Sequence, residues 1–241
     1  MIYIIGRGYL GSALADHFAN RGKDMTVIGR HDIWPKFEYE DTIINCAASG
    51  YRRHHYGVEG TVRDNYELPK RILDKSNGAN IIHFSSWTEQ FSFDVYSHSK
   101  ALATQLMLGR SHVCMTCTVW GGPFEDPSKF MMNFLRACAH GYPFAMYYPF
   151  QRRDFVHVST FCDAVEKLTL HREYKVRYFA TGRLRSFYEV YGTLTEVAGR
   201  AFPNVQVAED LSTTHEWRAK EPEFEDTFRD DLAKEWRILC K

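Results

Sequence analysis

A glycine-rich turn directly after a short apolar run is the feature that most restricts the fold of this chain. Residues 2–5 form the apolar run, and Gly6-Arg7-Gly8-Tyr9-Leu10-Gly11 follows it with the spacing G-x-G-x-x-G. After a buried strand, this spacing lets the backbone turn tightly into a helix whose first N–H groups and dipole can meet a pyrophosphate. Residues 9–21 continue with helical periodicity. The turn therefore predicts a strand–turn–helix unit that binds a dinucleotide.

Apolar segments then alternate with helical ones. Strands are expected over residues 25–28, 42–48, 80–84 and 113–119, and helices over 60–74 and 96–109. Few residues separate the second strand from the third, so the usual helix between them is expected to be reduced or missing. This alternation is typical of an α/β fold with a doubly wound parallel sheet, which binds its ligands at the carboxyl ends of the strands.

From Gly121 onward the pattern is looser. An amphipathic segment at 129–136, an aromatic-rich stretch, a strand at 154–158 and a helix at 160–171 precede a charged C-terminal portion. No linker separates a second domain. We therefore predict one unit over residues 1–241, with 1–120 mainly binding the cofactor and 121–241 forming a small C-terminal substrate-binding lobe.

Composition excludes several partners. Thirty basic and thirty acidic residues balance, so charge gives no reason to expect nucleic acid. The six cysteines are scattered, as expected of reduced thiols in a cytoplasmic protein. Cys114 and Cys117 have C-x-x-C spacing without a second pair, so no metal is expected. No apolar run approaches the roughly 20 residues that span a bilayer, and no membrane partner is expected.

The end of the second strand indicates which dinucleotide binds. An acidic side chain there would bond the ribose hydroxyls of NAD, whereas arginine suits the 2′-phosphate of NADP. The strand is followed by Gly29-Arg30, and Arg7 inside the glycine turn could approach the same phosphate. We therefore favour NADP(H), with NAD(H) as the alternative that Asp32 would support.

Hydroxyl groups and a Tyr–Lys pair point to redox chemistry. Ser85 and Ser86 follow the strand at 80–84, and Tyr96 and Lys100 lie four residues apart on the next predicted helix. A serine can donate a hydrogen bond to a carbonyl oxygen that gains negative charge during hydride transfer. Tyr96 can supply or remove the proton, and a neighbouring Lys100 ammonium is expected to lower the pKa of its phenol. A tyrosine and a lysine that merely cover a helix flank are the alternative.

In order along the chain, the motifs resemble those of a known family. The glycine turn is followed by Asn45-Cys46-Ala47-Ala48, Ser85-Ser86, Tyr96-x-x-x-Lys100, Trp120-Gly121-Gly122-Pro123 and Arg153-Asp154-Phe155-Val156-His157-Val158. Over roughly residues 1–200 this series is similar to the extended short-chain dehydrogenase/reductases, the NAD-dependent epimerase/dehydratase family. The resemblance implies a Rossmann fold, an NAD(P)-dependent oxidoreductase, a nucleotide-sugar substrate and a homodimer.

The resemblance also implies roles for single residues. Ser86, or Ser85, orients the keto group of the substrate, and Tyr96 is the proton donor or base. Lys100 holds the nicotinamide ribose and tunes Tyr96. The cofactor-binding set is Gly6, Arg7, Gly8, Tyr9, Leu10, Gly11, Arg30, Ala47, Ala48, Ser85, Tyr96 and Lys100. The substrate-binding set is Ser86, Trp87 and Arg153, with the Arg153 guanidinium suited to a diphosphate.

Departures from the family pattern reduce the number of reactions that the resemblance allows. Dehydratases of the family carry an Asp-Glu pair after the catalytic hydroxyl, where this chain has Trp87-Thr88, so dehydration is disfavoured. The segment from Ser86 to Tyr96 is short, and the site is expected to be open or rebuilt around Trp87, Phe91 and Phe93. The preferred hypothesis is NADP(H)-dependent reduction of a nucleotide-linked keto sugar, a 4-keto-6-deoxy hexose. The alternatives are a nucleotide-sugar epimerase that retains NAD and a non-catalytic NADP(H)-binding or redox-sensing protein.

Overall fold

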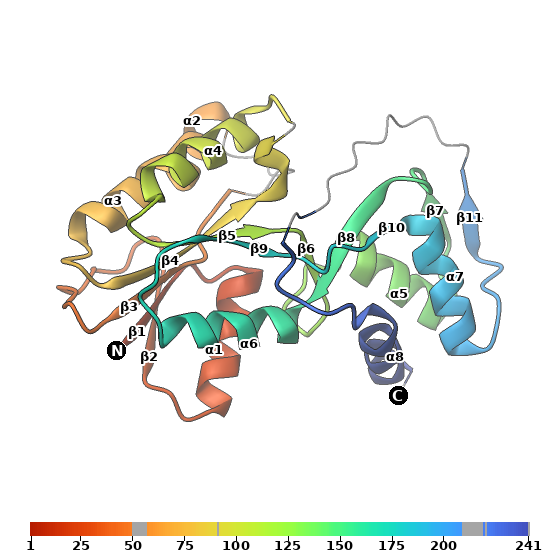
Figure 1. Cartoon of the computed structure of the whole chain (residues 1–241). Coiled ribbons are helices and arrows are strands. Elements are labelled where there is room, and N and C mark those ends of the chain that lie inside the picture. Colours follow the sequence, from red (N-terminus) through yellow and green to blue (C-terminus); the bar gives the residue numbers. More distant parts are fainter. Residues whose placement is uncertain (50–56, 91, 209–218, 220, 241) are drawn as a thin grey trace. The chain divides into compact units, whose positions relative to one another are not determined.

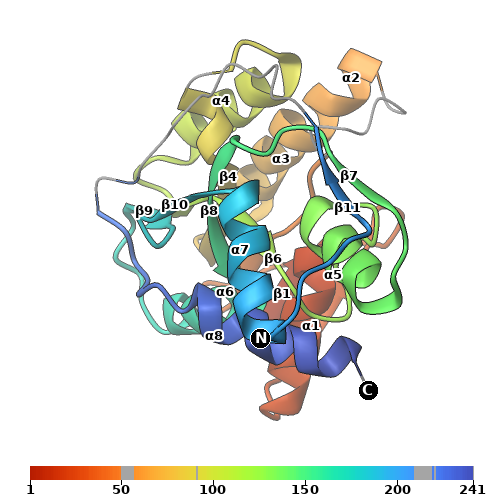
Figure 2. The same ribbon diagram turned by 90° about the vertical axis from the view of Figure 1, so that its right-hand side faces the viewer.

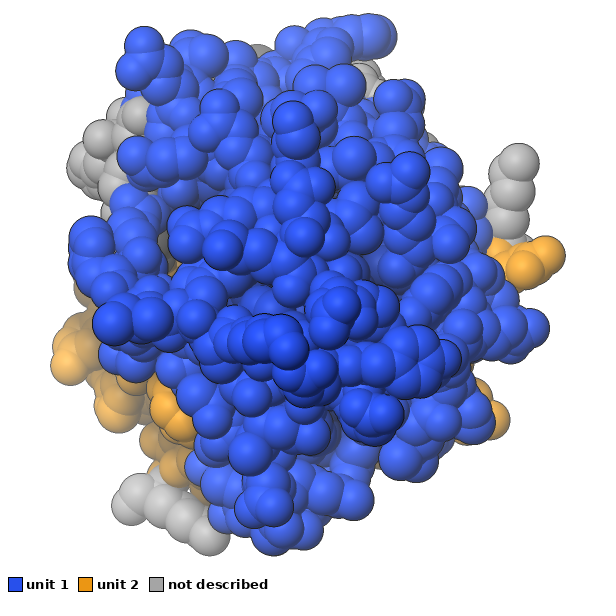
Figure 3. Space-filling view, turned by 90° about the vertical axis from the view of Figure 1, so that its left-hand side faces the viewer, with its two compact units in different colours: residues 1–116, 161–178 blue, residues 117–160, 179–241 orange. Residues whose placement is uncertain are grey.

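A computed structural model describes residues 1–49, 57–90, 92–208, 219 and 221–240 of the chain. The chain forms two compact units, which Figure 3 distinguishes by colour. Unit 1 contains residues 1–116 and 161–178, and unit 2 contains residues 117–160 and 179–241. The chain thus enters unit 2 at residue 117 and returns to unit 1 for residues 161–178. The assignment of cofactor binding to 1–120 and substrate binding to 121–241 stays a prediction. Phe91 lies outside the described residues.

A six-stranded sheet forms the centre of unit 1, in the order β2-β1-β3-β4-β5-β9. The strands are β1 (Ile2–Ile5), β2 (Met25–Ile28), β3 (Thr42–Asn45), β4 (Asn80–Ser86), β5 (His112–Thr116) and β9 (Val176–Phe179). Neighbours among β1 to β5 pair in parallel. Every residue of β3 and β4 is buried, as expected where helices cover both faces of a parallel sheet.

Helices cover both faces of this sheet. They are α1 (Tyr9–Asn20), α2 (Gly57–Val62), the π-helical turn η2 (Arg63–Glu67), α3 (Leu68–Lys75), the 3-10 turn η3 (Trp87–Gln90), α4 (Val95–Met107) and α6 (Val158–Thr169). Figure 1 shows α2, α3 and α4 on one face and α1 and α6 on the other. The predicted doubly wound parallel sheet is confirmed. Residues 29–41, between β2 and β3, contain no helix, as the sequence predicted.

Two predicted elements differ in detail. The strand expected at 113–119 is divided into β5 and β6 (Thr118–Trp120), because β6 leaves the central sheet and pairs with β8 (Arg152–His157) in unit 2. The helix expected at 60–74 is interrupted by η2, which buries Asn65 completely. Asn65 Oδ1 accepts a hydrogen bond from the Ser49 N–H at 2.9 Å, and so fixes the segment that follows β3.

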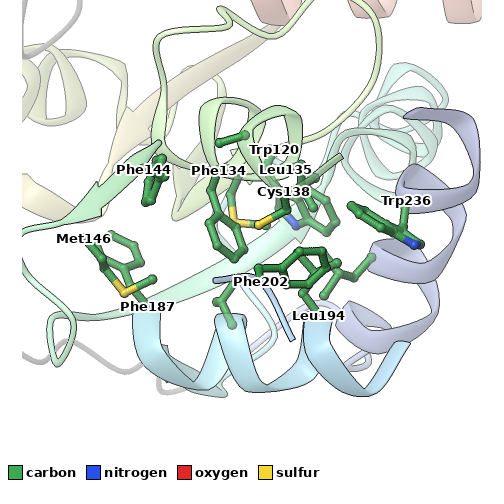
Figure 4. Packing of buried hydrophobic residues seen from close by; sticks show 14 of the residues in the cluster. Trp120, Phe134, Leu135, Cys138, Phe144, Met146, Phe187, Leu194, Phe202 and Trp236 are labelled. Atoms are coloured by element: carbon green, nitrogen blue, oxygen red, sulfur yellow. The ribbon is translucent and has the colours of Figure 1, made fainter. Parts of the chain in front are cut away.

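Unit 2 has its own apolar core. Its further elements are α5 (Phe130–His140), β7 (Phe144–Met146), β10 (Leu184–Ser186), α7 (Phe187–Ala198), β11 (Val205–Val207) and α8 (Phe228–Leu239). Figure 2 shows α7 beside α8, which it contacts. Figure 4 shows Phe134 of α5, Leu194 of α7 and Trp236 of α8 in one cluster. This core holds the sheets β10-β8-β6 and β11-β7 in place.

We did not predict α7, although the sequence carries a signal for it. Ser186 accepts a hydrogen bond from the Glu189 N–H, and the Glu189 carboxylate accepts one from the Ser186 N–H. This reciprocal pair is a capping box, readable as S-x-x-E ahead of an apolar segment. Among the described residues, no helix combines the length and the apolar character needed to cross a membrane.

Candidate functional site

The glycine turn between β1 and α1 has a shape that only glycine permits at two positions. Gly6 has φ +107°, and a Cβ there would lie 2.8 Å from the Ala47 backbone. A Cβ on Gly11 would lie 1.9 Å from the Gly6 carbonyl oxygen. At Gly8 a Cβ would meet no atom within 4 Å, and no side chain caps the α1 N-terminus that starts there. The open approach to the first turn of α1 suits the pyrophosphate of a dinucleotide.

The predicted lining residues gather around this turn. Tyr9 and Leu10 begin α1, and both are half-buried. Ala47 passes against Gly6 at the end of β3, and its N–H donates to Asn45 Oδ1 at 3.3 Å. Ala48 is exposed beside it. The turn after β1 and the segment after β3 therefore lie together, as the parallel register of the two strands requires.

Arg7 and Asp32 form an ion pair at the end of β2. The Arg7 guanidinium donates to Asp32 Oδ2 at 2.7 Å, and the Gly29 N–H donates to the same oxygen at 2.8 Å. The Asp32 carboxylate is thereby held at the position where an acidic side chain can bond ribose hydroxyls.

Arg30 is paired as well, with an acid from η2. Its guanidinium donates to Asp64 Oδ2 at 2.9 Å. Asp64 also accepts from Arg63 Nε at 3.1 Å and from Ser49 Oγ at 2.8 Å. One carboxylate is thus shared by two guanidinium groups. Both arginines expected to hold a 2′-phosphate lie near the end of β2, and each has a carboxylate partner.

Ser86, Tyr96 and Lys100 come together at the carboxyl end of β4. Ser86 ends β4, and its Oγ shares a hydrogen bond of 2.9 Å with Thr88 Oγ1. Tyr96 lies in the first turn of α4, where Asp94 caps the helix by accepting from the Ser97 N–H at 2.8 Å. The Ser86 side chain acts on the Tyr96 hydroxyl in the direction that lowers the pKa of the phenol.

Lys100 lies one turn further along α4 and is almost completely buried. Its exposed fraction is 5 %, and its Nζ donates to the Phe84 carbonyl oxygen at 2.9 Å. Burial lowers the pKa of Lys100 to about 8, against the opposing effects of Glu89 and Cys46. The neighbouring His83, also buried, has its pKa lowered to about 3 by burial and by Lys100, and is therefore neutral.

The pKa of Tyr96 shifts in the direction opposite to the expected one. Burial raises it, the hydrogen bond with Ser86 lowers it, and the charges of Asp94 and Glu89 raise it. Lys100 is not among these influences, and desolvation of the phenol dominates. The lowering expected from Lys100 together with the nicotinamide charge stays a prediction. Tyr96 is held as a protonated phenol, which suits a proton donor.

The expected substrate residues belong to different units. Trp87 is the half-buried first residue of η3 in unit 1. Arg153 lies on β8 in unit 2, where its guanidinium donates to Gln151 Oε1 at 3.2 Å and lies 6.0 Å from the centre of the Phe187 ring. Phe93 is 90 % exposed and does not wall the site.

Two polar residues of the site, Glu89 and Thr104, were not predicted from the sequence. Glu89 accepts hydrogen bonds from Ser85 Oγ and, at 2.9 Å, from Thr104 Oγ1. Thr104 could have been noticed, because Tyr96, Lys100 and Thr104 are four residues apart and share one face of α4. No comparable spacing marks Glu89, whose position depends on how η3 folds back onto α4.

Among the described residues, His17, Asp163 and Glu166 are the group that could offer metal ligands, with their ligand atoms within 4.8 Å of one another. Arg21 pairs with Asp163 at 2.8 Å and with Glu166 at 3.0 Å. Both carboxylates thus already have a cationic partner. The group is an ion-pair network that links α1 to α6.

Solved structures with the same fold cover nearly the whole chain. MoeE5 in complex with UDP-glucose and NAD has a TM-score of 0.80 at 20 % identity, with 98 % of this chain and 97 % of that one covered. RMD from Pseudomonas aeruginosa complexed with NADPH has a TM-score of 0.76 at 15 % identity, with 100 % of both chains covered. UDP-N-acetylglucosamine 4-epimerase from Methanobrevibacter ruminantium M1, in complex with UDP-N-acetylmuramic acid, has a TM-score of 0.80 at 14 % identity. The match covers 98 % of this chain and 96 % of that one. These likenesses confirm the fold.

No curated protein matches the sequence. A family model described as the NAD dependent epimerase/dehydratase family matches residues 34–178, a segment that contains the Ser86, Tyr96 and Lys100 site. The match confirms the resemblance seen in the motifs and the expected class, an enzyme that uses a nicotinamide dinucleotide. The chain belongs to the NAD dependent epimerase/dehydratase family.

Proposed function

We propose that the chain is an NADP(H)-dependent reductase of a nucleotide-linked keto sugar, a 4-keto-6-deoxy hexose. The observation that carries the proposal is the placement of Ser86 at the end of β4 and of Tyr96 in the first turn of α4, where burial raises the pKa of Tyr96 and keeps its phenol protonated. A reductase needs an acid beside the carbonyl oxygen at the start of its reaction. A protonated Tyr96 meets that need directly.

Each residue of the pair has a distinct task in this reaction. When bound, the reduced nicotinamide supplies the hydride that the carbonyl carbon receives. Ser86 Oγ donates a hydrogen bond to the carbonyl oxygen, and the Tyr96 hydroxyl transfers its proton to that oxygen as the C–H bond forms. The product is an alcohol, and Tyr96 becomes a phenolate that the Lys100 charge stabilises until solvent returns the proton.

Charge at the end of β2 supports NADP(H) over NAD(H). Three guanidinium groups, of Arg7, Arg30 and Arg63, face two carboxylates, of Asp32 and Asp64. Among these five side chains, guanidinium groups outnumber carboxylates. A 2′-phosphate could take up one of the arginines, since guanidinium groups bind phosphate in a bidentate manner.

The Arg30→Gln variant tests this cofactor preference. Hydrogen bonds to charged groups contribute about 1.5–3 kcal/mol, so the Kd for NADPH is expected to rise by about ten- to a hundred-fold. The Kd for NADH is expected to stay near its original value. Isothermal titration of the variant with both dinucleotides measures the effect. Lys36→Gln is the control, because Lys36 is exposed and pairs with Glu38. An equal loss for both dinucleotides would contradict the role given to Arg30.

A nucleotide sugar is proposed as the substrate because the proteins of similar fold include complexes with such molecules, among them UDP-glucose. Arg153 on β8 supplies a guanidinium that suits the diphosphate. Adding dTDP- and GDP-linked 4-keto-6-deoxy sugars to the protein with NADPH, and following nicotinamide absorbance, tests the reaction. Oxidation of NADPH by one sugar supports the proposal. NADPH binding without turnover on any of them overturns it and favours a sensor.

The epimerase alternative rests on Asp32. Its carboxylate, fixed by the Gly29 N–H, could bond the ribose hydroxyls of NAD in place of a phosphate. An epimerase retains its dinucleotide through each turnover. Release of NAD on denaturing the purified protein, together with turnover of a nucleotide sugar without added cofactor, would favour this alternative over the reductase.

A further inference from the structure

A carboxylate that the reaction above does not use lies next to the catalytic residues. Glu89, in η3, accepts hydrogen bonds from Ser85 Oγ and from Thr104 Oγ1, and Thr104 Oγ1 lies 2.8 Å from Ser85 Oγ. These three side chains close a polar cluster between the end of β4 and the middle of α4. Glu89 is not part of an Asp-Glu pair of the dehydratase kind, whose positions hold Trp87 and Thr88.

The position of the cluster ties it to Lys100. Thr104 follows Lys100 by one helical turn on the same face of α4, and the Lys100 Nζ bonds the carbonyl of Phe84, the residue before Ser85. A buried ammonium group that donates to a neutral carbonyl needs a nearby negative charge to stay ionised. Glu89 acts on Lys100 in this sense. Burial raises the pKa of the Glu89 carboxyl itself, while its hydrogen bonds with Ser85 and Thr104 and the charge of Lys100 lower it.

Other titratable groups around Lys100 do not supply that charge. Cys46, after β3, has its thiol pKa raised by burial and stays neutral. His83 on β4 is neutral at physiological pH. Asp94 caps α4 and acts on Tyr96. The helical elements α2, η2 and α3 also pack on α4, but none of their charged residues is among the groups that shift the pKa of Lys100. These residues are Glu59, Arg63, Asp64, Glu67, Lys70, Arg71, Asp74 and Lys75.

We propose that Glu89 is a positioning residue of the active site, which fixes η3 to α4 through Ser85 and Thr104 and keeps the buried Lys100 ammonium ionised. The part that concerns catalysis rests on the proposed function. With Glu89 neutral, Lys100 is expected to lose its proton at a lower pH, and the Glu89 charge, which raises the pKa of Tyr96, is removed as well. The hydrogen bonds of Glu89 join it to Ser85 and Thr104, so it is assigned a positioning role and no step of the proton transfer.

The Glu89→Gln variant tests the proposal without relying on turnover. The protein is labelled with ¹³C at lysine Cε, the Lys100 signal is assigned with Lys100→Met, and its chemical shift is followed against pH. The pH at the midpoint of the Lys100 titration is expected to fall by roughly one unit in Glu89→Gln, because a nearby negative charge is lost in a medium of intermediate dielectric. Glu89→Asp, which keeps the charge, is expected to restore it. Glu89→Met serves as a second neutral variant should Glu89→Gln not fold.

Thr104→Val is the matched control, because it removes a hydrogen bond of the cluster and leaves the charge in place. Its Lys100 midpoint is expected to stay close to that of the unaltered protein. Where a sugar is turned over, the alkaline limb of kcat/KM should move to lower pH in the neutral Glu89 variants and should stay in place in Thr104→Val. A Lys100 midpoint that is unchanged in both neutral variants overturns the proposal. A lowered midpoint in a protein that reduces no sugar supports the role of Glu89 while the proposed function fails.

Discussion

Replacing Tyr96 with phenylalanine is expected to lower kcat for reduction of the keto sugar by about 10²- to 10⁴-fold, the range typical of losing a positioned acid. The ring fills the same space without its hydroxyl, so the protein should fold. Because Tyr96 is one of many expected cofactor contacts, any rise in the Kd for NADPH should be small beside the loss of kcat. Stopped-flow absorbance under single-turnover conditions measures the hydride step directly, separate from product release.

Tyr142→Phe is a suitable control for this variant, since Tyr142 is 61 % exposed on unit 2 and has no proposed role in catalysis. It should turn over like the parent. If Tyr96→Phe were as fast as the parent, Tyr96 could not be the proton donor. If both variants lost NADPH binding, the change would be structural rather than chemical.

Replacing a glycine of the turn with alanine is expected to have different consequences at Gly8 and at Gly11. Gly8 has φ −80° and open space where a Cβ would lie, so Gly8→Ala should fold with an unchanged Tm. The methyl group would occupy the place of the pyrophosphate, and the Kd for NADPH should rise at least about tenfold, a loss of about 1.4 kcal/mol or more. Isothermal titration measures the affinity.

Gly11→Ala should instead destabilise the fold, because its Cβ would lie 1.9 Å from the Gly6 carbonyl oxygen and the backbone must move. Overpacking of this kind costs about 1–3 kcal/mol or more. Thermal unfolding should show a clear fall in Tm. Gly192→Ala, at an open position in α7, is the control for both variants. Unchanged dinucleotide affinity in Gly8→Ala would mean that the turn does not bind the pyrophosphate.

The sequence by itself determined the elements whose signals are local. Residues 2–5, the glycine turn and the following helix were readable because an apolar run, two sterically demanded glycines and a helical period adjoin one another. The parallel sheet followed from the alternation of such elements. Ser86, Tyr96 and Lys100 could be grouped because a strand end and a four-residue spacing on one helix place them together.

Tertiary structure decided the features that depend on partners distant in the chain. Arg7 meets Asp32, and Arg30 meets Asp64, only after β1, β2 and η2 have packed, and the charge balance at the cofactor site follows from those encounters. Glu89 reaches Thr104 because η3 folds back onto α4. The pKa of Tyr96 rises because burial removes water from the phenol, an effect that no spacing in the sequence encodes. Periodicity and sterics act over a few residues, whereas desolvation and ion pairing depend on the whole fold.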